Sequence, residues 1–386
     1  MHFRFLLADS QGDIELSPRD LDQPFRISPE EQHPFLTLKD YFGALQKFIM
    51  RDDGKNLICA LAEQGQQDAP SFADISEVLI RSEKHGAFYH IASIALSGRE
   101  DTGRLAVTTA LSKSARRSLR EEFTILRQLA GITPDYLPRL SVMEPVSWQT
   151  ESCTAEFLMV MGEWLEGYHE WHLNDDRTAG RHKIRLWDYD NGYRSLSEAE
   201  SFELLRQAAY ILTLYYDQGS FRQIYPWHHG AGDFVVKAQP NGLSVKLITA
   251  RQYEPLVHFG EEEEADRLVA AIHFLLNLAI RIRLDRLDGI GAPAWFDQWA
   301  VLAAVQGFFA GLAATAAANR LMLGPVADFL AILQSFETRE IYDMYDSLLA
   351  IYAEEDGDDF HLIRHKLADH AAELHAALKD FVLEKG

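Results

Sequence analysis

The 386-residue sequence lacks the features of several common protein classes. It has two cysteines, Cys59 and Cys153, too few for a disulfide framework and without CxxC spacing for zinc or redox chemistry. The apolar run before Asp9 is shorter than a signal-peptide core, and no later stretch reaches the roughly 20 apolar residues that span a bilayer. We therefore expect a cytoplasmic protein that does not bind membranes.

Positive charge is also scarce. The chain has 37 Lys and Arg residues against 58 Asp and Glu, a formal net charge of -21. Such a surface repels phosphate backbones and anionic lipid, so nucleic-acid binding is not expected, although a local basic pocket for a small anion stays open. The length and an apolar share of 47% suffice for two or three domains with sizeable cores.

Residues 1–74 mix short apolar runs with polar residues. In LKDYFGALQKFIM, Leu38, Phe42 and Leu45 fall on one helical face, and NLICALAE after it predicts a strand. The polar stretch QGQQDAPSFAD at 64–74 marks a boundary. These features predict a small N-terminal α/β appendage.

Residues 75–167 follow a different pattern. Three runs with period two, ISEVLIRS, AFYHIASIAL and RLAVTTAL, predict an antiparallel meander. SARRSLREEFTILRQLAG predicts a helix, and LPRLSVMEPVSW and AEFLMVMGEWLEG predict two more strands ending in a connector at 163–167. The order is three strands, one helix and two strands.

Residues 168–386 are mostly helical by pattern. A polar and aromatic excursion at 168–197 predicts a long loop rather than a domain, and Ser197 with Glu200 forms a capping box for a helix to Gly219. Two strands then flank a polar loop in YPWHHGAGDFVV and VKLITA, and everything after the acidic run at 261–264 reads as helix. The fold class is α+β.

This order resembles the protein-kinase-like fold, nearest its aminoglycoside phosphotransferase-like branch. The resemblance implies a two-lobed molecule. Its five-stranded antiparallel N-lobe with one helix would cover 75–167, and its mostly helical C-lobe would cover 168–386, with a residual catalytic loop at 225–250.

Three local matches carry the resemblance. EEFTILRQL places Glu122 where the family has the Glu that holds its nucleotide lysine. FLMVMGEWLEG, with Glu163, resembles the strand and connector against which adenine stacks. YPWHHGAGDFVV and VKLITA resemble the catalytic loop and the metal-binding segment. The resemblance thereby implies ATP and Mg²⁺ as cofactors.

The departures fall on the charged positions that phosphoryl transfer needs. Asp233 stands at the family's magnesium-binding Asn, His228 at the catalytic Asp, and Thr249 at the second metal-binding Asp. On the third strand, Thr108 or Thr109 takes the place of the lysine. Because these exchanges remove much of the electrostatic stabilisation of the transition state, ordinary kinase activity is not expected.

Each remaining candidate has a functional and a structural interpretation. His228 could act as a general base or simply be a hydrogen-bonded loop histidine. Asp233 could bind Mg²⁺ or cap amides of its own loop. Lys113, with Arg116 or Arg117, could replace the missing lysine at a phosphate, although such residues are usually solvated.

Histidines at 169, 172 and 182 raise the question of a zinc site. His169 and His172 would supply two ligands only if their segment were helical, and the chain has neither HExxH nor cysteine pairs. Packing and hydrogen bonding are therefore the favoured roles.

The sequence favours a catalytically degenerate kinase-like protein, a pseudokinase, that acts as a ligand-binding or regulatory module and holds either a nucleotide, weakly, or another ligand in its cleft. One alternative is an active atypical phosphotransferase or nucleotidyl transferase that uses His228 and Asp233 with a basic group from 113–117. Another is a scaffold whose helical part binds a partner protein.

Overall fold

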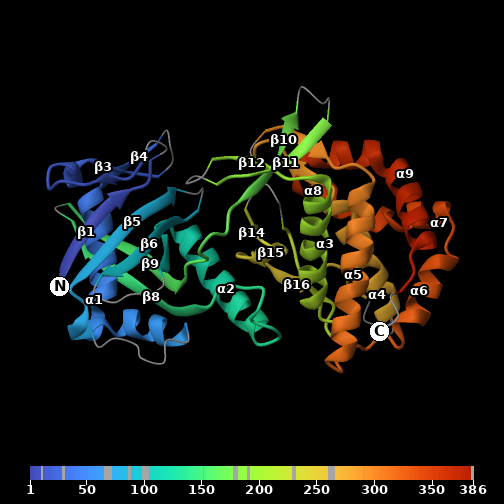
Figure 1. The fold of residues 1–386 in the computed structure, drawn as a ribbon, viewed down its shortest axis with the longest axis horizontal. Helices are drawn as coiled ribbons and strands as arrows, with labels where there is room; N and C mark the ends of the chain where they lie inside the picture. Colours follow the sequence, from blue (N-terminus) through green and yellow to red (C-terminus); the bar gives the residue numbers. More distant parts are fainter. Residues whose placement is uncertain are drawn as a thin grey trace. The chain divides into compact units, whose positions relative to one another are not determined.

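The computed structural model describes residues 1–9, 12–27, 31–64, 72–85, 88–97, 104–150, 152–176, 181–188, 192–227, 232–259, 266–289 and 291–383. The chain is α+β and divides into two compact units, Met1–Glu166 and Gly167–Gly386 (Figure 1).

A mixed sheet forms the framework of the first unit. Its described strands lie in the order β2-β1-β5-β6-β7-β9-β8, with β1 parallel to β5 and the other neighbours antiparallel. The strands are β1 (His2–Leu7), β2 (Ile14–Glu15), β5 (Glu77–His85), β6 (His90–Ser97), β7 (Leu105–Ala110), β8 (Leu140–Gln149) and β9 (Thr154–Glu163). A separate hairpin joins β3 (Pro24–Arg26) and β4 (Gln32–Thr37). Residues 1–74 therefore share a sheet with the strands that follow them.

The two helices of this unit, α1 (Leu38–Glu63) and α2 (Lys113–Ala130), pack on opposite faces of the sheet. Strand β9 shows this by alternation, because Phe157, Met159 and Met161 pack in the core of α1, whereas Leu158 and Val160 pack under α2. A strand covered on both faces reads as a continuous apolar run, which explains FLMVMG.

The prediction of a strand at NLICALAE is wrong, because these residues form the second half of α1. Leu57, Ala60 and Leu61 are fully buried and follow the helical rather than the strand period. The helix is interrupted before them by non-helical residues at 51–54, where Gly54 has a φ of 79°. The side chain of Phe72 lies so close to Gly54 that a Cβ would come within 1.9 Å of it, so glycine is required there.

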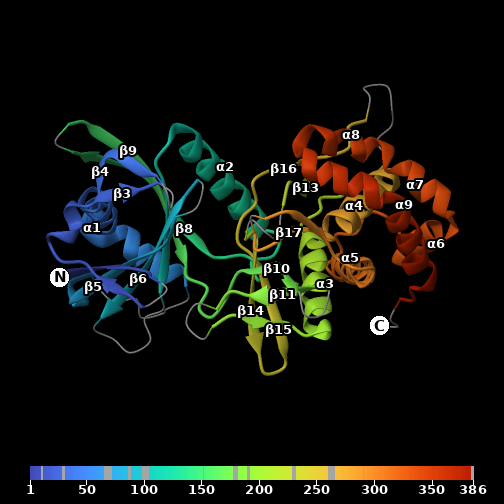
Figure 2. The same ribbon diagram turned by 90° about the horizontal axis from the view of Figure 1, so that it is seen from above.

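The second unit combines short sheets with seven helices among its described residues (Figures 1 and 2). The helices are α3 (Glu198–Leu214), α4 (Arg267–Arg281), α5 (Trp299–Ala317), α6 (Val326–Ser335), α7 (Thr338–Met344), α8 (Asp346–Glu355) and α9 (Gly357–Asp380), α7 being a short piece before α8. The strands pair as β10 (Trp171–Asp176) with β11 (Arg181–Leu186) and β12 (Arg194–Ser195), β13 (Arg222–Ile224) with β16 (Tyr253–Pro255), β14 (Phe234–Gln239) with β15 (Gly242–Leu247), and β17 (Leu284–Arg286) with β18 (Pro293–Trp295).

Three predictions for this unit need correction. The excursion at 168–197 is not a plain loop, since it contains β10, β11 and β12 and buries Trp171. The capping box of Ser197 and Glu200 is confirmed, but α3 ends at Leu214 rather than Gly219. The chain after 266 is not helical throughout, because β17 and β18 form a small hairpin between α4 and α5. The acidic run at 261–264 lies outside the described residues.

Helix α5 is long and apolar enough, by length and composition alone, to cross a membrane, and it is the only such helix in the described parts of the chain. The sequence had predicted no stretch of that kind. About 61% of the helix is buried, and it packs along α3. A Cβ at Gly307 would come within 2.2 Å of the Arg206 carbonyl oxygen of α3, so small residues allow the two helices to approach closely.

Candidate functional site

The loop between β13 and β14 is held at both ends by the segment that follows β15. At its start, where β13 pairs with β16, the Tyr225 amide donates to the Gln252 carbonyl at 3.3 Å. At its end, the Ile248 amide donates to the Asp233 carbonyl at 2.8 Å. The structure therefore places Asp233 of YPWHHGAGDFVV next to Ile248 of VKLITA, the two segments that the sequence had paired.

His228 and Thr249 are two of the predicted site residues in this region. His228, the candidate base, falls in 228–231, outside the described residues. Thr249 is half-buried directly after β15, and its hydroxyl stands where the resemblance requires a carboxylate.

Asp233 forms the best-defined polar contact of the loop. It is 1% exposed, and its two carboxylate oxygens accept hydrogen bonds from the two terminal nitrogens of Arg251, at 2.5 and 2.6 Å. The Arg251 side chain is 39% exposed. This is the parallel, two-bond geometry in which guanidinium and carboxylate match best. The arginine neutralises a carboxylate that would be costly to bury alone.

A second carboxylate, that of Glu170, approaches the same loop from the segment just before β10. A Cβ built on Gly232, which has a φ of 70°, would lie 3.1 Å from Oε1 of Glu170. The segment that contains Glu170 is held next to β14 because His169 and Val236 exchange backbone hydrogen bonds at 2.9 and 3.0 Å. Glu170 and Arg251 were not predicted as site residues. Only the position of Arg251, two residues after Thr249, gave a signal for it in the sequence.

Among the described residues, His169, His172 and His182 are not grouped to hold a metal ion. His169 and His172 would need a helix to supply two ligands, but His172 lies on strand β10 and His169 forms a β-bridge with Val236. Each histidine lies near a carboxylate of its own: His169 near Asp188 at 3.6 Å, His172 near Glu170 at 3.8 Å and His182 near Asp175 at 4.0 Å. Within the described residues, no three His, Cys, Asp or Glu side chains are grouped to hold a metal ion.

The residues around Asp233 do not fit the magnesium ion that the resemblance implies. Magnesium takes oxygen ligands in near-octahedral geometry and prefers one or two carboxylates plus phosphates and water. Both oxygens of Asp233 already accept from Arg251, and Thr249 offers one hydroxyl in place of a charged ligand. The guanidinium stands where a cation would have to approach.

The candidate nucleotide-binding residues of the first unit are Lys113, Glu122 and Glu163, and solvent exposure or local packing accounts for the position of each. Lys113 is exposed in the first turn of α2, and Glu122 is 7% exposed on the face of α2 that packs on the sheet. A carboxylate oxygen of Glu163 accepts from the Arg139 amide at 3.2 Å, so this side chain helps to hold the end of β9.

The third strand places its two threonines on opposite faces. Thr109 is fully buried on the face of the sheet that α1 covers, and Thr108, its neighbour, points to the face under α2. Arg116 is held by the Leu111 and Glu156 carbonyls, to which its guanidinium donates. The exposed Arg117 lies 3.8 Å from Glu121 on the same helix. These contacts fix the two arginines at the start of α2.

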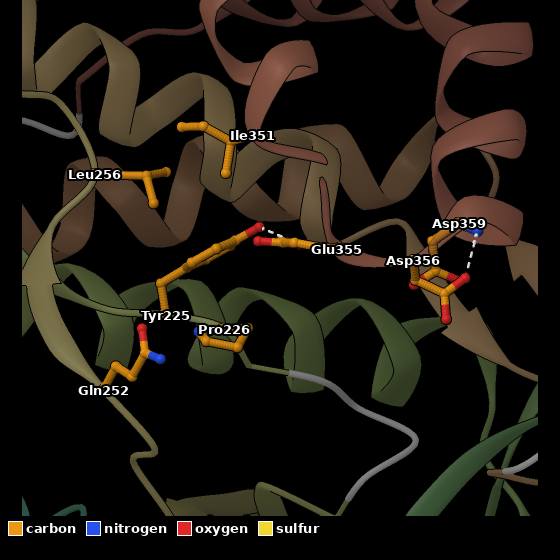
Figure 3. A pocket seen from close by; sticks show the side chains of 8 residues that line it. All are labelled: Tyr225, Pro226, Gln252, Leu256, Ile351, Glu355, Asp356 and Asp359. Atoms are coloured by element: carbon orange, nitrogen blue, oxygen red, sulfur yellow. Dashed lines mark hydrogen bonds between the residues drawn. The ribbon is translucent and has the colours of Figure 1, made fainter. Parts of the chain in front are cut away.

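Beside the loop, the second unit has a pocket of about 430 Å³ (Figure 3). Tyr225 and Pro226 line it from the loop, and Gln252 lines it from the segment after β15. The remaining lining residues are Leu256, Ile351, Glu355, Asp356 and Asp359. The pocket thus has an apolar part and an acidic part.

Each carboxylate of the pocket already has partners. Tyr225 donates to Glu355 at 2.7 Å, and Arg286 donates to both Asp356 and Asp359, at 2.9 and 2.8 Å. Burial raises the pKa of Asp359, and the nearby Arg286 opposes that shift. Burial also raises the pKa of the Tyr225 hydroxyl, which therefore stays protonated as a donor. The acidic wall is part of a balanced network, and phosphate groups would be repelled by it.

A second buried network joins the helices of this unit. Arg283 is 3% exposed, donates to Glu373 and to Nδ1 of His370, and lies 4.9 Å from the centre of the Trp295 ring. The other ring nitrogen of His370 lies 2.7 Å from the Tyr345 hydroxyl, which in turn donates to the Leu276 carbonyl. Complete burial and the charge of Arg283 hold the pKa of His370 well below its ordinary value. These partners assign a neutral imidazole with the proton on Nε2.

The chain resembles known proteins only distantly. No protein-family model matches it. A segment is 26% identical over 136 residues to the sodium-dependent nutrient amino acid transporter 1 of Drosophila erecta, covering 31% of this chain and 21% of that protein. The match thus spans about a fifth of the relative's length.

The solved structures similar to the chain include protein kinase domains. A Rad53 fragment in complex with AMP-PNP is 14% identical, with 60% of this chain and 52% of that chain covered and a TM-score of 0.32. A double mutant of the Mycobacterium tuberculosis PknI kinase domain is 11% identical, with 76% and 92% covered and a TM-score of 0.30. The chain is structurally similar to kinase domains at low TM-score, which does not by itself establish the fold.

Proposed function

We propose that the chain has a protein-kinase-like fold with a degenerate phosphotransfer site and serves as a ligand-binding or regulatory module. The order of elements supports the fold. Strands β5, β6 and β7, helix α2 and strands β8 and β9 follow the order that the resemblance implies, and a mostly helical unit comes after them. The position of Glu122 on the buried face of α2 is consistent with the same fold.

The observation that carries the proposed function is the state of Asp233. Of the residues at the three catalytic and metal-binding positions, His228, Asp233 and Thr249, only Asp233 is a carboxylate, and Arg251 donates to both of its oxygens. Phosphoryl transfer depends on metal ions that bridge the phosphates and neutralise developing charge. A carboxylate already neutralised by an arginine cannot take that role without first losing its partner.

The ligand of such a module need not be a nucleotide. The pocket beside Tyr225 combines apolar side chains with paired carboxylates, and this combination suits a small molecule without phosphate groups better than ATP. Weak nucleotide binding stays part of the proposal, with Lys113, Glu122 and Glu163 as its candidates in the first unit.

Turnover of ATP tests the function directly. We expect the wild-type protein with millimolar ATP and Mg²⁺ to release no more phosphate than Asp233→Ala, with exposed Lys379→Ala as the control for a surface change. Magnesium-dependent turnover that His228→Ala abolishes would overturn the proposal and establish an atypical phosphotransferase. Ligand-dependent stabilisation without turnover would support the binding module, and absence of both would favour a scaffold.

A further inference from the structure

We infer that the Arg251 guanidinium is a built-in cation, which takes the place of a divalent metal ion at the Asp233 carboxylate. The inference deepens the proposed function, since it rests on the same loop and explains how the loop is held without a metal. It also makes a prediction that ordinary degeneration of a site would not make. Removal of Arg251 should turn the Asp233 region into a site that responds to divalent cations.

The geometry of the pair supports this role. Two hydrogen bonds of 2.5 and 2.6 Å place the planar guanidinium across both oxygens of Asp233, so its charge is delivered to the whole carboxylate. A hard cation bound in the bidentate manner would use the same two oxygens. Arginine and metal ion therefore exclude one another at this position.

The burial of the two partners is unequal. Asp233 is 1% exposed, whereas the Arg251 side chain is 39% exposed and reaches the carboxylate from the solvent side. The acid thus belongs to the interior of the unit, and the cation is the partner that can be removed without opening the core. A carboxylate at this depth that loses the charge of Arg251 gains from a proton or another cation.

Backbone hydrogen bonds on either side of Arg251 position it next to Asp233. The Ile248 amide donates to the Asp233 carbonyl, and four residues later the Gln252 carbonyl accepts from the Tyr225 amide. Arg251 lies between these two anchors, so both ends of the loop and the guanidinium are tied to one short segment. The loop gains from the arginine the cross-link that a metal ion would otherwise supply.

Glu170 is a second carboxylate in the region that the Arg251 guanidinium would leave empty in Arg251→Ala. Its Oε1 lies against Gly232, the residue before Asp233, on the connector that is paired to β14. Without Arg251, Asp233 and Glu170 would both add negative charge to the surroundings of Gly232, which favours the approach of a divalent cation. A Lys at 251 would keep a charge but lose the two-bond geometry.

The test compares thermal unfolding in EDTA and in millimolar Mg²⁺ or Mn²⁺, at matched ionic strength and without nucleotide. Wild type should be insensitive to either cation. Arg251→Ala should lose roughly 4–8 °C in Tm in EDTA and regain part of the loss with Mn²⁺ or Mg²⁺ in a saturable way. Asp233→Asn combined with Arg251→Ala should be more stable than the single variant and should not respond.

Arg251→Lys provides a second variant should Arg251→Ala not fold, and we expect a smaller loss of Tm with a weaker cation response. The inference is overturned if folded Arg251→Ala or Arg251→Lys shows no divalent-cation response, or if the wild type itself gains stability from Mg²⁺. Because no nucleotide is present, this outcome is separate from that of the turnover assay. Metal-dependent turnover by the wild type would remove the proposed function even if Arg251→Ala gained a cation response.

Discussion

Two ion-pair systems of the second unit differ in which partner is buried. In the loop, the acid is inside and the arginine is half-exposed: Asp233 is 1% exposed and the Arg251 side chain 39%. Among the helices the order is reversed, with the Arg283 side chain 4% exposed and Glu373 29%. The first arrangement leaves a carboxylate whose cation can be exchanged from solvent, and the second encloses the cation.

The surroundings of the two arginines agree with this difference. Arg283 is enclosed by the Trp295 ring, His370 and the Phe296 carbonyl, to which its Nε donates at 2.9 Å. These contacts join the chain just after α4 to β18 and α9, so the Arg283 network has a structural role. The loop pair connects two short segments at the end of a hairpin, where the resemblance implies chemistry. The two pairs therefore differ in the partner that solvent can reach, which is the arginine in the loop and the glutamate among the helices.

The largest effect that would test this comparison is expected at Arg283. Arg283→Ala removes the partner of Glu373 and leaves a buried cavity beside Trp295, so the free energy of unfolding should fall by about 3–5 kcal/mol. Arg251→Ala should cost less, about 1–3 kcal/mol, because its side chain is partly solvated. Urea unfolding of both variants measures the two losses, and an equal or larger loss at Arg251 would break the distinction.

A smaller effect is expected from the pH dependence of His370. Its folded-state pKa is lowered by burial and by Arg283, so the unfolded chain binds a proton first as the pH falls below the ordinary value of about 6.5. Stability contributed by the neutral imidazole is complete above that pH and is lost below it, by at most about 1.4 kcal/mol per pH unit.

His370→Gln supplies the matched control. A carboxamide can accept from Arg283 and donate to Tyr345 as the neutral ring does, but it does not titrate. We expect the difference in stability between wild type and variant to shrink between about pH 7 and pH 5 because only the wild type loses this contribution. The same acid dependence in both proteins would show that other groups determine it. Glu373, Tyr345 and Arg283 face the ring and are common to both.

Much of the first unit could be predicted because its signals are local. The alternation of RLAVTTAL, the helical face of α2 and the apolar run of β9 each predict one element, and the structure has these elements in the expected order. The strand at NLICALAE was wrong because a short apolar run is compatible with a buried helix as well as with a strand. The helix that it forms depends on packing against the sheet.

The site was less predictable because its contacts depend on tertiary pairing. The registers of β13 with β16 and of β14 with β15 bring Arg251 to Asp233, eighteen positions away, and neither register can be derived from residue types alone. Glu170 reaches Gly232 through an isolated bridge between His169 and Val236. The polar excursion before α3 gave no periodic pattern for its strands, so this contact had no signal in the sequence.

The most direct test of the central claim is the thermal stability of wild type with ATP in the presence of Mg²⁺ and in the presence of EDTA, with Asp233→Ala measured in parallel. The account predicts that any shift caused by ATP is the same with and without the metal, because Arg251 already neutralises Asp233. A stabilisation that requires Mg²⁺ and disappears in Asp233→Ala would contradict it, since Asp233 would then be a working metal ligand.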